Sequence, residues 1–83
     1  MNLFRFQSLL IRFTISDSAL STLESIHSAG VIHGAISSDN VLIGHSGVTI
    51  IDFAHAEQSS SLKAKKREYA YLRSILQDLA GED

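Results

Sequence analysis

Apolar residues in the opening stretch of the chain recur at steps of three and four. This spacing predicts an amphipathic segment over residues 1–16, because such steps place side chains on one face of a helix. The residues that share this face are Leu3, Phe6, Leu10 and Phe13. A short strand at residues 13–15 remains an alternative, since residues that favour strands gather there.

Two further stretches carry a helical period. The first predicts a helix over residues 17–29, which starts at the potential capping residues 16–18 and stops at Gly30. The second predicts a helix over residues 62–80, again followed by a glycine.

The region between these helices has the short apolar runs of strands. Residues 41–51 hold two such runs around a four-residue turn that begins and ends with glycine, which predicts a hairpin. A third run lies at residues 31–32, and residues 57–61 are polar and indicate a flexible loop. The predicted fold class is α+β, with a helix beside a small hairpin sheet and a terminal helix closing the other side.

Composition places the chain among small globular proteins. Of its 83 residues, 45% are hydrophobic and 19% charged, which is too apolar for a disordered chain. The absence of cysteine excludes disulfides, thiolate metal sites and cysteine nucleophiles. Seven basic residues against nine acidic ones give a net charge of −2, which offers no general attraction for nucleic acid.

Charged residues also bear on localisation. Arg5 and Arg12 interrupt the opening apolar stretch before it reaches the roughly 18 uncharged residues of a membrane span. The stretch also lacks the pattern of a secretory signal. We expect an intracellular, cytoplasmic protein without a membrane or nucleic-acid partner, and the basic residues of 63–67 are expected to form a solvated first turn of the last helix.

Two polar segments carry the candidate chemistry. Residues 33–40 read His-Gly-Ala-Ile-Ser-Ser-Asp-Asn, and residues 52–54 read Asp-Phe-Ala. With the preceding Leu-x-x-Ile-His-Ser-Ala-Gly-Val-Ile-His of residues 23–33, they resemble the catalytic loop and metal-binding motif of protein-kinase-like phosphotransferases. The resemblance covers residues 20–56. It implies part of a kinase-like C-lobe, with helix, catalytic loop, hairpin and C-terminal helix in that order.

The resemblance assigns roles to individual residues. In the family, an Asn of the catalytic loop and the Asp of Asp-Phe-Gly hold the metal ions that bridge the nucleotide phosphates. Asn40 and Asp52 match these positions, and His33 matches the scaffold histidine. The implied cofactors are Mg²⁺ and ATP, whose binding we expect to be weak or lost. Outside this motif, Asn40 and Asp52 would be ordinary turn and strand-end residues.

Departures from the family pattern argue against catalysis. Ala35 stands where the family has its catalytic Asp, and a methyl group accepts no proton, so no catalytic residue is intact. Ser37 replaces the loop lysine, and Ala54 replaces the glycine of Asp-Phe-Gly. The 83 residues contain no glycine-rich phosphate loop, strand lysine or Ala-Pro-Glu segment.

We therefore expect residues 1–83 to be a single truncated kinase-like domain that is catalytically inactive. It would serve as an interaction module or be a partial gene copy. The alternative is the C-terminal part of an ATP-dependent phosphotransferase, completed by a missing or partner-supplied N-lobe. We expect a protein partner or a second copy to cover the apolar face of residues 1–16, because exposed apolar surface usually marks an interface.

Overall fold

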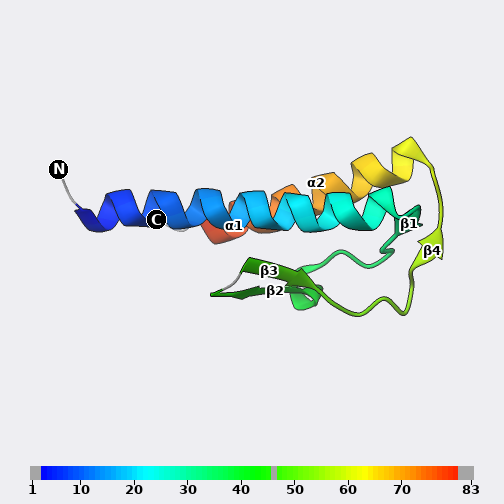
Figure 1. Ribbon diagram of the computed structural model, residues 1–83, viewed down its shortest axis with the longest axis horizontal. Helices are drawn as coiled ribbons and strands as arrows, with labels where there is room; N and C mark the ends of the chain where they lie inside the picture. Colours follow the sequence, from blue (N-terminus) through cyan, green and yellow to red (C-terminus); the bar gives the residue numbers. More distant parts are fainter. Residues whose placement is uncertain (1–2, 46, 81–83) are drawn as a thin grey trace.

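The computed structural model describes the backbone of residues 3–45 and 47–80, and the side chains of residues 15–45 and 47–78. Within these residues it is a small α+β domain of two α-helices and two small antiparallel sheets, which confirms the predicted class (Figure 1). The elements in chain order are α1 (Leu3–Ser28), β1 (Val31–Ile32), the 3-10 turn η1 (Ser38–Asn40), β2 (Val41–Gly44), β3 (Gly47–Ile50), β4 (Glu57–Gln58) and α2 (Leu62–Ala80).

Helix α1 is continuous from Leu3 to Ser28, so the predicted helix start at residue 17 is wrong and so is the alternative strand at residues 13–15. The polar residues that suggested a helix start have another role. The Ser18 hydroxyl accepts a hydrogen bond from the Val48 amide of β3 at 2.9 Å. Ser18 thus lies inside the helix and binds a strand. In the sequence, such a residue looks the same as a helix-capping residue, which explains the wrong helix start.

Strands β2 and β3 form the predicted hairpin, with Val41 opposite Ile50 and Ile43 opposite Val48. Strand β3 lies along α1 (Figure 1). The Thr22 hydroxyl of α1 donates to the Val48 carbonyl at 3.2 Å, a bond it shares with the Ser18 carbonyl one turn back at 2.8 Å. Helix α1 therefore supplies hydrogen-bond partners to the edge of β3 that faces away from β2.

Residues 57–61 are not the flexible loop that their polarity suggested. Glu57–Gln58 forms β4 and pairs antiparallel with β1, with Ile32 opposite Glu57. The Ser59 amide then donates to the Gly30 carbonyl at 2.9 Å. The pairing partners lie more than twenty residues apart, so no local pattern reveals them.

Helix α2 covers the residues that the helical period predicts and runs antiparallel to α1 (Figure 1). The Ser61 hydroxyl caps its first turn by accepting a hydrogen bond from the Ala64 amide at 3.2 Å. Lys63, Lys66 and Arg67 are exposed, as expected for a solvated first turn.

The core lies where α1, α2 and the hairpin meet. Its buried members are Ala19, Leu23, Ile36, Val41, Val48, Ile50, Leu72 and Leu76. Each helix contributes a row of residues spaced by four, the separation that places side chains on one helix face. On α1 this row continues to His27, and on α2 it begins at Glu68, and both of these polar residues are buried.

Over their described residues, α1 and α2 both fall short of the unbroken apolar length that crossing a membrane would require.

The predicted interface residues Leu3, Phe6, Leu10 and Phe13 lie on α1, but their side chains lie outside the described residues. Their role as an interface stays a prediction. We expect the chain to self-associate at micromolar concentrations, and the double substitution Phe6→Asp with Leu10→Asp to shift it toward monomer or unfold it, because two buried carboxylates would be uncompensated. Size-exclusion chromatography with light scattering measures the effect.

The matched control is Ser8→Asp with Arg12→Asp, which adds two carboxylates at positions that the helical period assigns to the opposite face. The prediction is contradicted if the wild-type chain runs as a well-folded monomer and the Phe6 and Leu10 variant has the same size and stability. This face would then be neither an interface nor part of the core.

Candidate functional site

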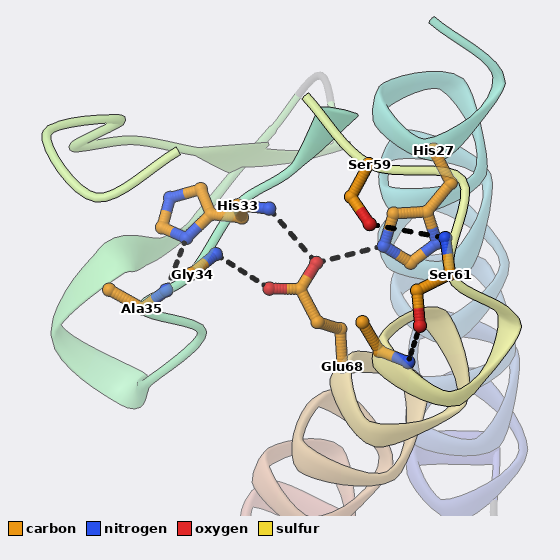
Figure 2. Close-up of polar contacts among 8 residues, drawn as sticks. His27, His33, Gly34, Ala35, Ser59, Ser61 and Glu68 are labelled. Carbon is orange, nitrogen blue, oxygen red and sulfur yellow. Dashed lines mark hydrogen bonds and ion pairs between the residues drawn. The ribbon is translucent and has the colours of Figure 1, made fainter. Parts of the chain in front are cut away.

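The loop that follows β1 is anchored to α2 by one carboxylate. The Glu68 side chain accepts the His33 amide at 3.0 Å on Oε1 and the Gly34 amide at 2.7 Å on Oε2. Figure 2 shows the carboxylate between these two amides and the ring of His27. Both amides belong to the beginning of the candidate catalytic loop, where they would otherwise need water as an acceptor.

His27 completes the environment of Glu68. Its Nε2 lies 2.8 Å from Glu68 Oε1, and the two side chains are only 4% and 6% exposed. A carboxylate that already faces two amides is an acceptor, so His27 Nε2 carries the hydrogen. His27 Nδ1 is buried and has no partner among the described residues.

Tyr69 packs edge-on against the His27 ring, with centroids 5.2 Å apart. Burial raises the pKa of the Tyr69 phenol above its usual value, and the nearby Glu24 carboxylate adds to the rise. The Tyr69 ring therefore covers part of the buried His27 side chain.

His33 connects the loop to the end of the hairpin. It is fully buried, and its Nε2 lies 2.8 Å from the Ile51 carbonyl. Since a carbonyl only accepts, Nε2 donates, and Nδ1 is left free to accept the Ala35 amide at 3.1 Å. Phe53 packs edge-on against the ring at 4.7 Å. Both ring nitrogens are thus used to hold backbone, which is what a scaffold histidine does.

Gly34 has a conformation that no other residue adopts without strain. Its φ is +87°, and a Cβ built on it would lie 3.0 Å from the His55 carbonyl carbon. The backbone at His55 therefore packs directly on Gly34. This close approach brings the segment after Asp52 next to the candidate catalytic loop.

Asn40 and Asp52 lie at the same end of the hairpin, Asn40 just before β2 and Asp52 shortly after β3. The Asn40 side-chain amide donates to the Ala35 carbonyl at 2.9 Å, and its backbone carbonyl accepts the Ile51 amide at 2.9 Å. Asp52 is exposed and has a φ of 62°, which is uncommon for a residue with a side chain. Its Oδ1 accepts the Ala54 amide in a long 3.3 Å bond.

The oxygen donors of Asn40 and Asp52 have the chemistry that Mg²⁺ prefers. Among the side chains of residues 15–45 and 47–78, however, no group of three or more His, Asp or Glu gathers around a common point. The Asn40 amide nitrogen is already used inside the loop, which leaves its Oδ1 as the available donor. The two residues would hold a Mg²⁺ only together with water and the phosphates of a bound nucleotide.

Ala35, at the catalytic position, lines an open groove of about 410 Å³ between the loop and α2. Two carboxylates share this groove, Glu57 of β4 and Glu68 of α2. The two carboxylate oxygens of Glu68 already accept the three hydrogen bonds described above. Ala35 contributes a methyl group and no carboxylate to this groove.

Sequence reasoning missed the two residues that anchor the loop, Glu68 and His27. A signal was present: Glu68 is four residues before Leu72, and His27 is four residues after Leu23, so both extend a row of core positions. A charged residue in such a row must find a partner, because burying it alone is costly. Two such positions on two antiparallel helices indicate that they face each other.

Comparison with protein-family models, curated proteins and solved structures gave no match.

The anchoring role of Glu68 predicts a loss of stability in Glu68→Gln. The amide side chain keeps one acceptor oxygen but brings an NH₂ group toward backbone N–H donors, which leaves at least one buried donor unpaired. We expect the free energy of unfolding to fall by about 1–3 kcal/mol. Urea denaturation at neutral pH, followed by circular dichroism, measures it.

The control is Glu24→Gln on the exposed side of α1, which should change the free energy of unfolding by less than about 0.5 kcal/mol. Equal stability of the Glu68 and Glu24 variants would show that the buried carboxylate does not hold the loop.

Proposed function

We propose that this chain is the catalytic-loop part of a protein-kinase-like domain and that it acts as a non-catalytic module. The observation that carries the proposal is that the loop keeps the side chains that hold its backbone but has no carboxylate at the position of the catalytic base. His33 matches the scaffold histidine of the family and Asn40 matches its loop metal ligand, and both hold backbone through their side chains. The position between them that matches the catalytic base is a methyl group, Ala35.

Of the two carboxylates in the groove, Glu68 does not replace the missing base. A general base must reach the hydroxyl proton within about 2.6–3.2 Å, directly or through one water. Glu68 accepts a hydrogen bond on each oxygen, so turning it toward a substrate would leave the buried His33 amide and the Gly34 amide unpaired. Glu57 lies on β4, on the other strand of the sheet that leads into the loop. Catalysis by this chain would need Glu57 to act as the general base.

A second candidate function is the C-terminal part of an ATP-dependent phosphotransferase that another lobe completes. Three exposed apolar side chains favour it, namely Leu42, Ile51 and Phe53, at 49%, 37% and 46% exposure. Ile51 and Phe53 flank Asp52, and Leu42 follows Asn40 by two residues. A nucleotide base and a covering lobe would bury this surface beside the candidate metal ligands.

The two candidates differ in phosphoryl transfer. We expect no transfer of the γ-phosphate from ATP by this chain in the presence of Mg²⁺, because loss of the base alone costs roughly 10² to 10⁴ in rate. Ala35→Asp should not restore transfer, since the 83 residues hold neither the glycine-rich loop nor the strand lysine with which the family positions ATP. Radiolabelled ATP with a mixture of protein and small-molecule acceptors measures it, and an active kinase in the same mixture is the positive control.

Time-dependent transfer by either chain that disappears in Asp52→Asn would contradict the non-catalytic proposal. Transfer by the wild-type chain that disappears in Glu57→Gln would identify Glu57 as a replacement base.

A further inference from the structure

The two edges of the β2–β3 hairpin are not equivalent. On β3, the amide and carbonyl of Val48 are bound by Ser18 and Thr22 of α1, so they point away from β2. In an antiparallel pair, the residue opposite such a position also directs its backbone groups outward. Ile43 is opposite Val48, so its N–H and C=O point away from the hairpin on the β2 side.

The same alternation applies two residues along the strand. Val41 is opposite Ile50, two residues after Val48, and its N–H and C=O are directed to the same side as those of Ile43. None of these groups is hydrogen-bonded outside the hairpin to any residue that the structure describes. Helix α1 closes one edge of the sheet. The β2 edge is open at Ile43, which is 42% exposed, whereas Val41 is buried at 7% exposure.

The open edge borders a groove of about 390 Å³, a volume within the range of ligand pockets of roughly 300–1,000 Å³. One wall is β2, and the other is the last part of α2. The lining residues are Ser38, Val41, Leu42, Ile43, Ile75 and Asp78. Four of them are aliphatic, and Asp78 supplies the one charge among them.

We propose that this groove binds an extended peptide that pairs with the β2 edge and carries a basic residue toward Asp78. A groove between a strand edge and a helix is one of the recurring sites for strand addition, in which backbone hydrogen bonds give affinity and side-chain pockets give specificity. Ile43 supplies the accessible backbone groups, the aliphatic lining takes the peptide side chains that face the groove, and Asp78 selects a cation.

Charge favours such a peptide over a second copy of the chain. Pairing β2 with its own copy would place Val41–Gly44 in the groove, a segment without a cation for Asp78. The proposal goes beyond the proposed function and does not depend on whether the chain transfers phosphoryl groups.

The probe is a fluorescein-labelled, end-capped peptide of alternating valine and threonine with a lysine at each end, titrated in fluorescence anisotropy with the full chain. We expect saturable binding. Two further peptides carry N-methyl groups on alternate sets of amides. In an added strand, only every second residue directs its backbone N–H toward β2. One N-methylated peptide should therefore bind like the parent, and the other should lose at least about 3- to 10-fold in affinity.

The matching substitution in the protein is Ile43→Pro, which removes only a donor that points away from β3 and should leave the hairpin ladder in place. We expect it to weaken binding by about 3- to 10-fold, while Ile43→Val, which keeps the amide, leaves the affinity unchanged within about 2-fold. Asp78→Lys, at an exposed position, should weaken binding of the lysine-bearing peptide by about 2- to 5-fold at low ionic strength.

Three outcomes would overturn the proposal. The first is no saturable binding to the folded wild-type chain. The second is equal binding of both N-methylated peptides, a result that does not depend on whether the proline variant folds. The third is a wild-type dimer that Ile43→Pro converts to monomer without any peptide binding, which would assign the β2 edge to a second copy.

Discussion

A single buried carboxylate holds the candidate site together. The loop that carries Ala35 and Asn40 leaves its strand after two residues, so its first amides have no neighbouring strand or helix to accept their hydrogen bonds. Glu68 accepts two of them and binds His27 as well. The end of α1, the start of the loop and the first half of α2 therefore meet at one side chain. Any change that removes its acceptor oxygens leaves donors unpaired in two segments at once, the end of α1 and the start of the loop.

The second constraint acts on the hairpin. Two hydroxyl side chains in the middle of α1, those of Ser18 and Thr22, bind the backbone of Val48 and fix which edge of the sheet is covered. The hairpin in turn places Asn40 and Asp52 at one end, where His33 joins the loop to the Ile51 carbonyl. The arrangement of the site thus rests on polar side chains that bind backbone, with the apolar core behind them.

The helical period predicts α2 and the C-terminal half of α1, and the two short apolar runs around a glycine turn predict the hairpin. These patterns are local in the sequence. The errors arise from contacts between distant segments. Residues 16–18 have the composition of a helix cap, yet Ser18 binds a strand thirty residues later. Glu57–Gln58 is polar, yet it pairs with β1. The motif positions His33, Asn40 and Asp52 follow from sequence, whereas the anchoring role of Glu68 depends on a partner on another helix.

The exchange of the His33 and Gly34 amide hydrogens, followed by NMR, tests the role of Glu68 most directly. Both amides should be protected in the wild-type chain, although neither donates to a backbone carbonyl. Protection should be lost in Glu68→Gln, while the Leu42 and Thr49 amides of the hairpin remain protected. Exchange of the His33 and Gly34 amides in the wild-type chain at the rate of an unfolded peptide, or protection that survives in Glu68→Gln, would contradict it.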